Sequence, residues 1–265
     1  MKFRLDIAIY PRSPVFIGRS SDVLSADKSF EVDWKGRAVI PATSFRGRVR
    51  AQLESLANSV ESLKSSCRPP KPEEMCKPDT AGPDPAPRAC VACRIFGNPW
   101  LPSPIVVSDF VLSVAPRRTY AERITKVGGE DGQGDDRATS WQNTVLPAKL
   151  MRTHVSISRQ TKTAAEERLF TFEIPGFCSD DARLCYVGTV TGDLAPGDLG
   201  LLLVAMKSVQ RIGGGKGRGL GAVEKVALNA IAIAGEPSVY GDAAEDRARR
   251  LIEAALEGVM ASARN

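Results

Sequence analysis

The sequence contains no long uninterrupted run of apolar residues. A membrane-spanning helix needs roughly 18 or more of them in succession, and no such run occurs in this chain. The amino-terminal segment MKFRLDIAIYPR alternates polar and apolar residues and lacks the apolar core of a signal peptide. We therefore expect no membrane span and a cytoplasmic location.

Aromatic residues and histidine are also scarce. Phe, Trp and Tyr make up 6% of the 265 residues, and His154 is the single histidine. An RNA-binding sheet that stacks on bases needs clustered aromatic residues, and no such cluster is evident. A hydrophobic content of 43% still provides a sizeable core. The net charge of +5 is compatible with a polyanionic partner without identifying one.

The cysteines are unevenly distributed along the chain. Two of the six stand apart, at Cys178 and Cys185, and the others are Cys67, Cys76, Cys90 and Cys93. The CVAC pair has zinc-knuckle spacing, and disulfides are rare in the cytosol. We therefore expect one structural zinc ion bound by the four clustered cysteines. The alternatives are free cysteines in a proline-rich insertion, or a redox pair that lacks the surrounding βαβ pattern.

The order of strand and helix patterns predicts an α+β fold. Strand patterns occur at residues 3–9, 104–112, 169–174, 184–192 and 221–234, and helix patterns at 45–63, 196–212 and 242–263. Thr43 or Ser44 is expected to cap the first helix. The core order is β-α-β-β-α-β, the ferredoxin-like pattern that RNA-recognition domains share. Residues 67–104 are expected to form an insertion without regular structure, and residues 115–166 a long excursion from the core.

The segment QRIGGGKGRGLG, residues 210–221, is a cationic loop with few side chains. It is not a phosphate-binding P-loop, because Gly217 follows Lys216 where Ser or Thr is required and a strand pattern comes next. Glycines allow backbone N–H groups to approach a phosphate closely, and Arg211, Lys216 and Arg218 supply positive charge. We favour a phosphate or nucleic-acid cradle over a flexible linker, which would be longer and richer in serine.

A second basic site is expected at the start of the first helix. Arg46, Arg48 and Arg50 crowd its first turns, where cations oppose the helix dipole. An anion bound at the exposed N–H groups would account for this arrangement better than an uncompensated cost in stability.

Four segments in order resemble the RAMP superfamily of CRISPR proteins. They are IPATSFRGRVR (40–50), CRIFGNP (93–99), VSDFVL (107–112) and GGGKGRGLGAV (213–223). More narrowly, they resemble the backbone subunit of type III effector complexes, and the cysteine insertion resembles that of type III-D members. The resemblance implies one RAMP domain over residues 1–265, comprising a ferredoxin-like palm, a zinc-binding insertion (67–104) and a thumb-like hairpin from the excursion (115–166).

The resemblance also implies partners and roles for individual residues. The partners would be a CRISPR guide RNA, a target RNA, other effector subunits and further copies of the chain. Asp27 matches the aspartate that cleaves target RNA with Mg²⁺ or Mn²⁺, and Asp22 is its nearest competitor. The implied RNA contacts are Ser44, Arg46, Arg48, Arg50, His154, Arg159, Arg211, Gly213, Gly214, Gly215, Lys216, Gly217, Arg218 and Gly219.

Three functions remain open from the sequence. The first is a guide-bound backbone subunit that cuts target RNA at six-nucleotide intervals, which the family's architecture implies. The second is the same scaffold without catalysis, because inactive subunits occur in the family. The third is a guide-processing endoribonuclease, which needs a working histidine or an equivalent residue. The resemblance implies that such a histidine often lies near the first helix, which is far from His154 in the sequence.

Overall fold

The computed structural model describes residues 1–20, 26–63, 67, 71–77, 89–115, 148–176 and 183–262. The predictions for Asp22, for Cys178 and for residues 116–147 lie outside these residues. The strands are β1 (Lys2–Pro11), β2 (Gly18–Ser20), β3 (Lys28–Phe30), β4 (Val39–Ile40), β5 (Ile105–Val107), β6 (Phe110–Ala115), β7 (Ala148–Ile157), β8 (Ala164–Gly176), β9 (Arg183–Asp193), β10 (Val223–Ile233) and β11 (Val239–Tyr240). The helices are α1 (Ala42–Asn58), α2 (Val91–Phe96), α4 (Pro196–Lys207) and α5 (Gly241–Ser262), with 3₁₀ turns η1 (Glu61–Leu63), η2 (Pro72–Glu74) and η4 (Lys216–Arg218).

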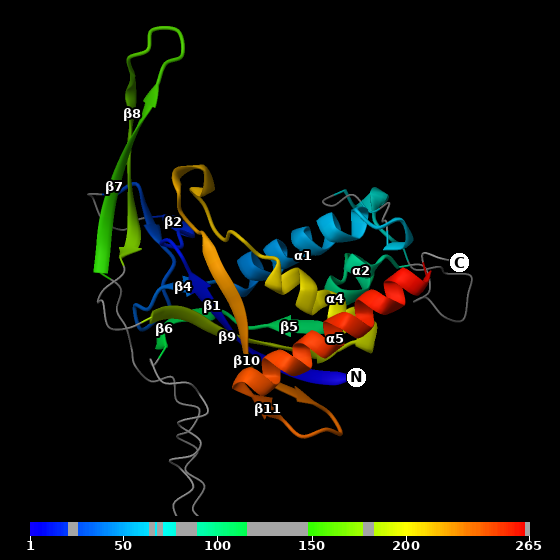
Figure 1. Ribbon diagram of the computed structural model, residues 1–265. Coiled ribbons are helices and arrows are strands. Elements are labelled where there is room, and N and C mark those ends of the chain that lie inside the picture. Colours follow the sequence, from blue (N-terminus) through cyan, green and yellow to red (C-terminus); the bar gives the residue numbers. More distant parts are fainter. Residues whose placement is uncertain are drawn as a thin grey trace, which may run out of the picture.

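The described strands form two sheets in a mixed α+β fold, as the sequence predicts. The main sheet has the order β11-β10-β1-β9-β6-β4, with β5 also paired to β9, and its described pairs are antiparallel. The smaller sheet has the order β2-β3-β8-β7 and contains one parallel pair, β3 with β8. Helices α1, α2, α4 and α5 gather on one side of the main sheet, while the β7–β8 hairpin projects away from it (Figure 1).

The core lies between the main sheet and its helices. Alternation in β1 turns Phe3, Leu5, Ile7 and Ile9 toward the helices, and all four are buried. In α1 the buried face is Phe45, Val49, Leu53 and Ala57, spaced by one helical turn. The central helix α4 is apolar almost all round, since it packs between α1 and α5 as well as on the sheet. No helix within the described residues is long and apolar enough to cross a membrane.

Three local predictions were wrong. The N-cap of α1 is Pro41, with no side-chain cap from Thr43 or Ser44. Instead Asp109 accepts a 2.7 Å hydrogen bond from the Ala42 N–H. Asp109 is free to do so because the predicted strand 104–112 is interrupted between β5 and β6. The insertion contains a helix, α2, where the sequence predicts no regular structure.

The excursion expected over residues 115–166 overlaps β7 and the first residues of β8.

The junction between the hairpin and β3 is secured by a buried carboxylate. Glu173 of β8 is 5% exposed and accepts hydrogen bonds from Ser29 of β3 and from Lys149 of β7, the latter at 3.1 Å. Burial by itself would raise the pKa of Glu173, but the hydrogen bonds from Ser29 and Lys149 outweigh it and hold that pKa below its ordinary value. One side chain thus connects three strands of the smaller sheet.

Glu173→Gln should therefore lower the free energy of unfolding by about 2 kcal/mol at neutral pH. A depressed folded-state pKa contributes stability above the unfolded pKa and loses it as pH falls through the folded value. The difference between wild type and variant, measured by urea denaturation, should shrink from about pH 7 to about pH 3. Glu166→Gln, an exposed change on the same strand, is the control. An equal deficit at both pH values would contradict the assignment.

Candidate nucleic-acid interface and metal centre

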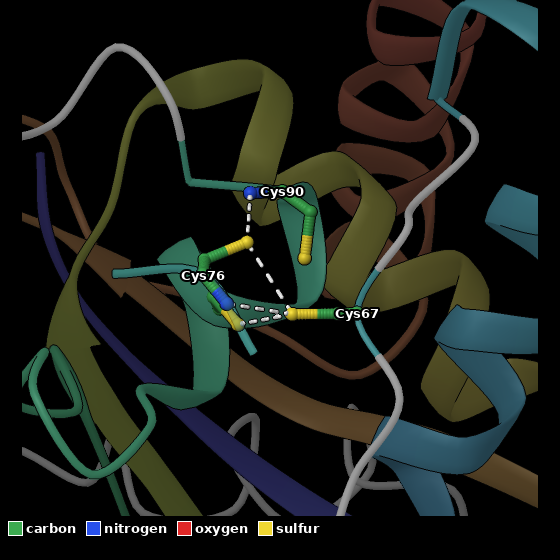
Figure 2. Close-up of side chains that lie close together, drawn as sticks. Cys67, Cys76 and Cys90 are labelled. Carbon is green, nitrogen blue, oxygen red and sulfur yellow. Dashed lines mark hydrogen bonds between the residues drawn. The ribbon is translucent and has the colours of Figure 1, made fainter. Parts of the chain in front are cut away.

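The four clustered cysteines converge on one point, as the sequence predicts. Their sulfur atoms all lie within 4.8 Å of one another, and Cys67 Sγ lies 3.3 Å from that of Cys76 and 3.4 Å from that of Cys93. Figure 2 shows Cys67, Cys76 and Cys90 directed at a common centre from separate segments. Four sulfurs bound at about 2.3 Å to a tetrahedral ion would lie about 3.8 Å apart. The cluster could therefore hold a metal ion such as zinc with little movement.

Backbone groups around the cluster suit thiolate ligands. The N–H of Cys76 donates to Cys67 Sγ at 3.1 Å, and the N–H of Cys90 donates to Cys76 Sγ at 3.4 Å. Burial raises the pKa of the Cys76 thiol to about 11. A hydrogen bond with Cys90, together with burial, raises the pKa of Cys93. A cation at the centre would reverse this effect, because it stabilises the charged form of each sulfur.

The cysteine insertion is fastened to the helical layer by arginines. Arg46 and Arg50 of α1 donate to the backbone carbonyls of Phe96 and Gly97, the second at 2.9 Å, where α2 ends. Cations are favourable at a helix C-terminus, where carbonyls lack intrahelical partners. Arg94 of α2 forms a bidentate pair with Asp198 in the first turn of α4, at 2.7 and 3.0 Å.

The expected anion site at α1 is therefore only partly available. Arg46 and Arg50 direct donors into the protein, and the described residues offer no partner to the buried Nε of Arg48. Ser44 and Arg48 are half-buried in the first two turns. A cavity of about 510 Å³ opens at the face of α1 that carries Thr43, Arg46 and Gly47, and it is also lined by the 96–103 segment.

The glycine loop, residues 210–221, is hydrogen-bonded to the segment that follows β1. The Gly214 N–H donates to the Phe16 carbonyl at 2.7 Å, and the Gly221 N–H donates to the Pro14 carbonyl at 2.8 Å. Gly213 and Gly221 have φ of 85° and 69°. A Cβ on Gly213 would lie 2.4 Å from the Phe16 oxygen, and one on Gly221 would lie 1.9 Å from the Ile212 oxygen. These two glycines are required by the fold itself.

Other glycines in the loop are not required by the fold. Gly217 has an ordinary φ, and a Cβ there would meet no atom within 4 Å. Gly214 would make only ordinary van der Waals contacts, the nearest at 3.5 Å. Gly47 in α1 is similarly open, although glycine within a helix costs about 1 kcal/mol relative to alanine. A ligand backbone that approaches closely would explain glycine at such positions.

The loop also presents unused hydrogen-bond donors. The N–H groups of Gly213, Gly215, Lys216 and Gly217 donate to no acceptor among the residues that the structure describes. The Lys216 and Gly217 side of the loop is exposed. Arg211 crosses the loop and donates to the Lys216 carbonyl at 2.5 Å. Consecutive unpaired N–H groups beside a lysine form a concavity suited to an anion.

The hairpin meets this loop through an aromatic cluster that sequence reasoning missed. We call Phe16, His154, Phe170, Phe172 and Arg218 the hairpin-base cluster. The Phe16 and Phe172 ring centroids lie 5.1 Å apart, and His154 lies 5.8 Å from Phe170 and 5.4 Å from Phe172. The described residues offer no partner to the buried Nε2 of His154. The available signal was the alternation of Phe170 and Phe172, which places both rings on one face of β8.

Asp27 lies at the same junction. Its N–H donates to the Thr171 carbonyl at 3.0 Å, and its Oδ2 accepts a 2.6 Å hydrogen bond from the Thr171 N–H. The side chain is exposed. The structure thus brings Asp27, His154 and the glycine loop together around β8. Arg159 lies apart from them in the exposed tip that joins β7 to β8. Cys90 and Cys93 belong to α2 and its N-cap, and α2 lies with the other helices, away from the hairpin (Figure 1).

The model of the RAMP superfamily matches residues 9–224 of the chain. The chain belongs to the RAMP superfamily. RAMP proteins act in CRISPR complexes with RNA and other subunits, so membership indicates a CRISPR-associated RNA-binding subunit. The matched region includes the cysteine cluster, the hairpin and the glycine loop, and it ends at the start of β10. No curated protein matches the chain.

Purified RAMP protein should contain about one zinc ion per chain, as measured by elemental analysis. Cys93→Ser should reduce the metal content severalfold and lower the melting temperature, because it removes a buried ligand. Cys185→Ser is the control: this cysteine is equally buried but lies outside the cluster, so its loss should leave the metal content unchanged. A stable wild-type protein without metal would contradict the assignment.

Proposed function

We propose that this RAMP protein is the guide-RNA-binding backbone subunit of a type III CRISPR effector complex in the cytoplasm. The observation that carries the proposal is the exposed side of the glycine loop. The N–H groups of Lys216 and of Gly213, Gly215 and Gly217 have no acceptor among the described residues, and a Cβ added at Gly217 would meet no atom within 4 Å. Exposed main-chain N–H groups can donate to the phosphates of an RNA backbone that approaches closely. Such contacts do not depend on the identity of the bases.

The arrangement of the rest of the chain supports a palm and a thumb. The strand order β10-β1-β9-β6, with α1 and α4 on one face, is compatible with a ferredoxin-like palm. The β7–β8 hairpin projects beside the glycine loop and is suited to serve as a thumb (Figure 1). It overlaps the proposed excursion 115–166 and extends past it to Gly176. The four-cysteine cluster supports a zinc-binding insertion over residues 67–104, which resembles that of type III-D members.

We further propose that Asp27 takes part in cutting target RNA. Asp27 is exposed, and its Oδ2 accepts from Thr171 near the hairpin base, while Oδ1 has no partner among the described residues. Such an oxygen can bind Mg²⁺ or Mn²⁺, which would stabilise charge on the phosphate that the neighbouring 2′-hydroxyl attacks. The hairpin would place this carboxylate once per subunit along the guide, at intervals of about six nucleotides, as the family resemblance implies.

One observation favours a scaffold without catalysis. The hydrogen bond from Thr171 to Asp27 gives the carboxylate a structural role in joining β3 to β8, and this role needs no metal. The guide-processing alternative receives less support, because His154 lies in the hairpin-base cluster with Nε2 buried. Both alternatives retain the RNA-binding glycine loop.

Gly217→Ala should weaken binding of single-stranded RNA by roughly tenfold or more, because the methyl group keeps a phosphate from the charge-assisted hydrogen bonds of the loop. The melting temperature should not fall, since a Cβ there has open space. Gly221→Ala is the matched comparison, and it should lower stability by about 2 kcal/mol or more through strain. Unchanged RNA affinity in Gly217→Ala would place the phosphate contacts elsewhere.

Asp27→Asn should abolish target cutting in a complex assembled with guide RNA and Mg²⁺ while target binding persists. Asparagine can still accept from the Thr171 N–H, so the junction with β8 should survive while the charge for the metal is lost. Asp33→Asn is the control, because Asp33 is held by Arg37 in the same connection. If wild type fails to cut matched RNA under these conditions, the scaffold function is correct.

A further inference from the structure

The Arg218 guanidinium lies against the hairpin. Its central carbon is 5.2 Å from the Phe170 ring centroid and 5.8 Å from that of Phe172. A planar guanidinium over aromatic faces is attracted by the ring quadrupoles and loses little conformational freedom in making the contact. Within the glycine loop, this side chain therefore has a protein partner.

Lys216 and Arg218 diverge although they are close in sequence. Both lie in η4, a 3₁₀ turn, in which successive residues rotate by about 120°. Two residues apart, their side chains therefore leave the turn in directions about 120° apart. Arg218 reaches β8 on one side, while Lys216 stays exposed beside the unpaired N–H groups.

Phe16 provides a second connection between the glycine loop and the β7–β8 hairpin. The Phe16 carbonyl accepts from Gly214 in the loop, and the Phe16 ring packs on Phe172 of the hairpin. The backbone of Phe16 thus contacts the glycine loop, and its side chain contacts the hairpin. With Arg218, this gives two independent connections between the glycine loop and the hairpin, neither of which involves RNA.

We infer that Arg218 is a positioning residue, which holds the β7–β8 hairpin in a fixed orientation on the glycine loop instead of binding guide phosphate. The inference rests on the proposed RNA-binding role of the loop. It assigns different tasks to two neighbouring cations that the sequence alone groups together. The spacing between the site where phosphate binds and the site where the hairpin crosses the RNA is then set in the protein before RNA arrives.

The test compares Arg218→Met, Phe170→Leu and Lys216→Met. Two quantities are measured for each: hydrogen exchange of residues 148–176 in the RNA-free protein, and the slope of log affinity against log salt for a labelled single-stranded RNA. Arg218→Met and Phe170→Leu should each raise hairpin exchange by roughly fivefold and leave the salt slope unchanged. Lys216→Met should reduce the slope by about 0.7 and leave hairpin exchange unchanged.

Two results would overturn the inference: a salt slope that falls in Arg218→Met as it does in Lys216→Met, or hairpin exchange that stays at the wild-type rate in Arg218→Met. Arg218 is exposed, so its replacement should not prevent folding even if Phe170→Leu does. If Lys216→Met leaves the slope unchanged, the proposed RNA contact of the loop fails. The exchange of the RNA-free hairpin still decides whether Arg218 positions it.

Discussion

The approach of the glycine loop to the backbone of Phe16 is the contact on which one whole side of the molecule depends. It brings residues 213–214 to within hydrogen-bonding distance of the segment that leaves β1, the strand between β10 and β9 in the main sheet. The same segment sends the Phe16 ring to β8. Because a Cβ at Gly213 would overlap the Phe16 oxygen, this approach is available to glycine alone.

Strand β8 contributes most of the contacts that lie around the glycine loop. Glu173 connects it to β3 and β7, Thr171 binds Asp27, and Phe170 and Phe172 face Arg218. The cysteine cluster belongs to a separate part, joined to α1 and α4 by Arg46, Arg50 and Arg94. The arginines at the start of α1 thus secure the cysteine insertion to the helical layer, while the glycine loop keeps its exposed donors.

Local patterns were enough to predict some of these features. The alternation of β1, the apolar face of α1 and the convergence of Cys90 with Cys93 follow from residue spacing, because neighbours in sequence impose them. The Asp109 cap, the Phe16–Phe172 contact and the Arg46 bond to Phe96 join residues far apart in sequence. Composition and periodicity carry no signal for such pairs. From the sequence, Thr43 or Ser44 is therefore expected to cap α1, and the arginines of its first turns are expected to contact RNA alone.

Because the β7–β8 hairpin is long, a small tilt at its base moves its tip a long way. From Phe172 back to Ala164, where β8 begins at the hairpin tip, the strand extends about 26 Å at roughly 3.3 Å per residue. A tilt of about 10° at the cluster would carry the tip about 4–5 Å, more than the spacing of roughly 3.4 Å between successive bases of a strand. A hairpin of this length can keep its tip at one nucleotide of the RNA only if its base does not tilt. The packed aromatic rings and the planar guanidinium of the hairpin-base cluster restrict that tilt.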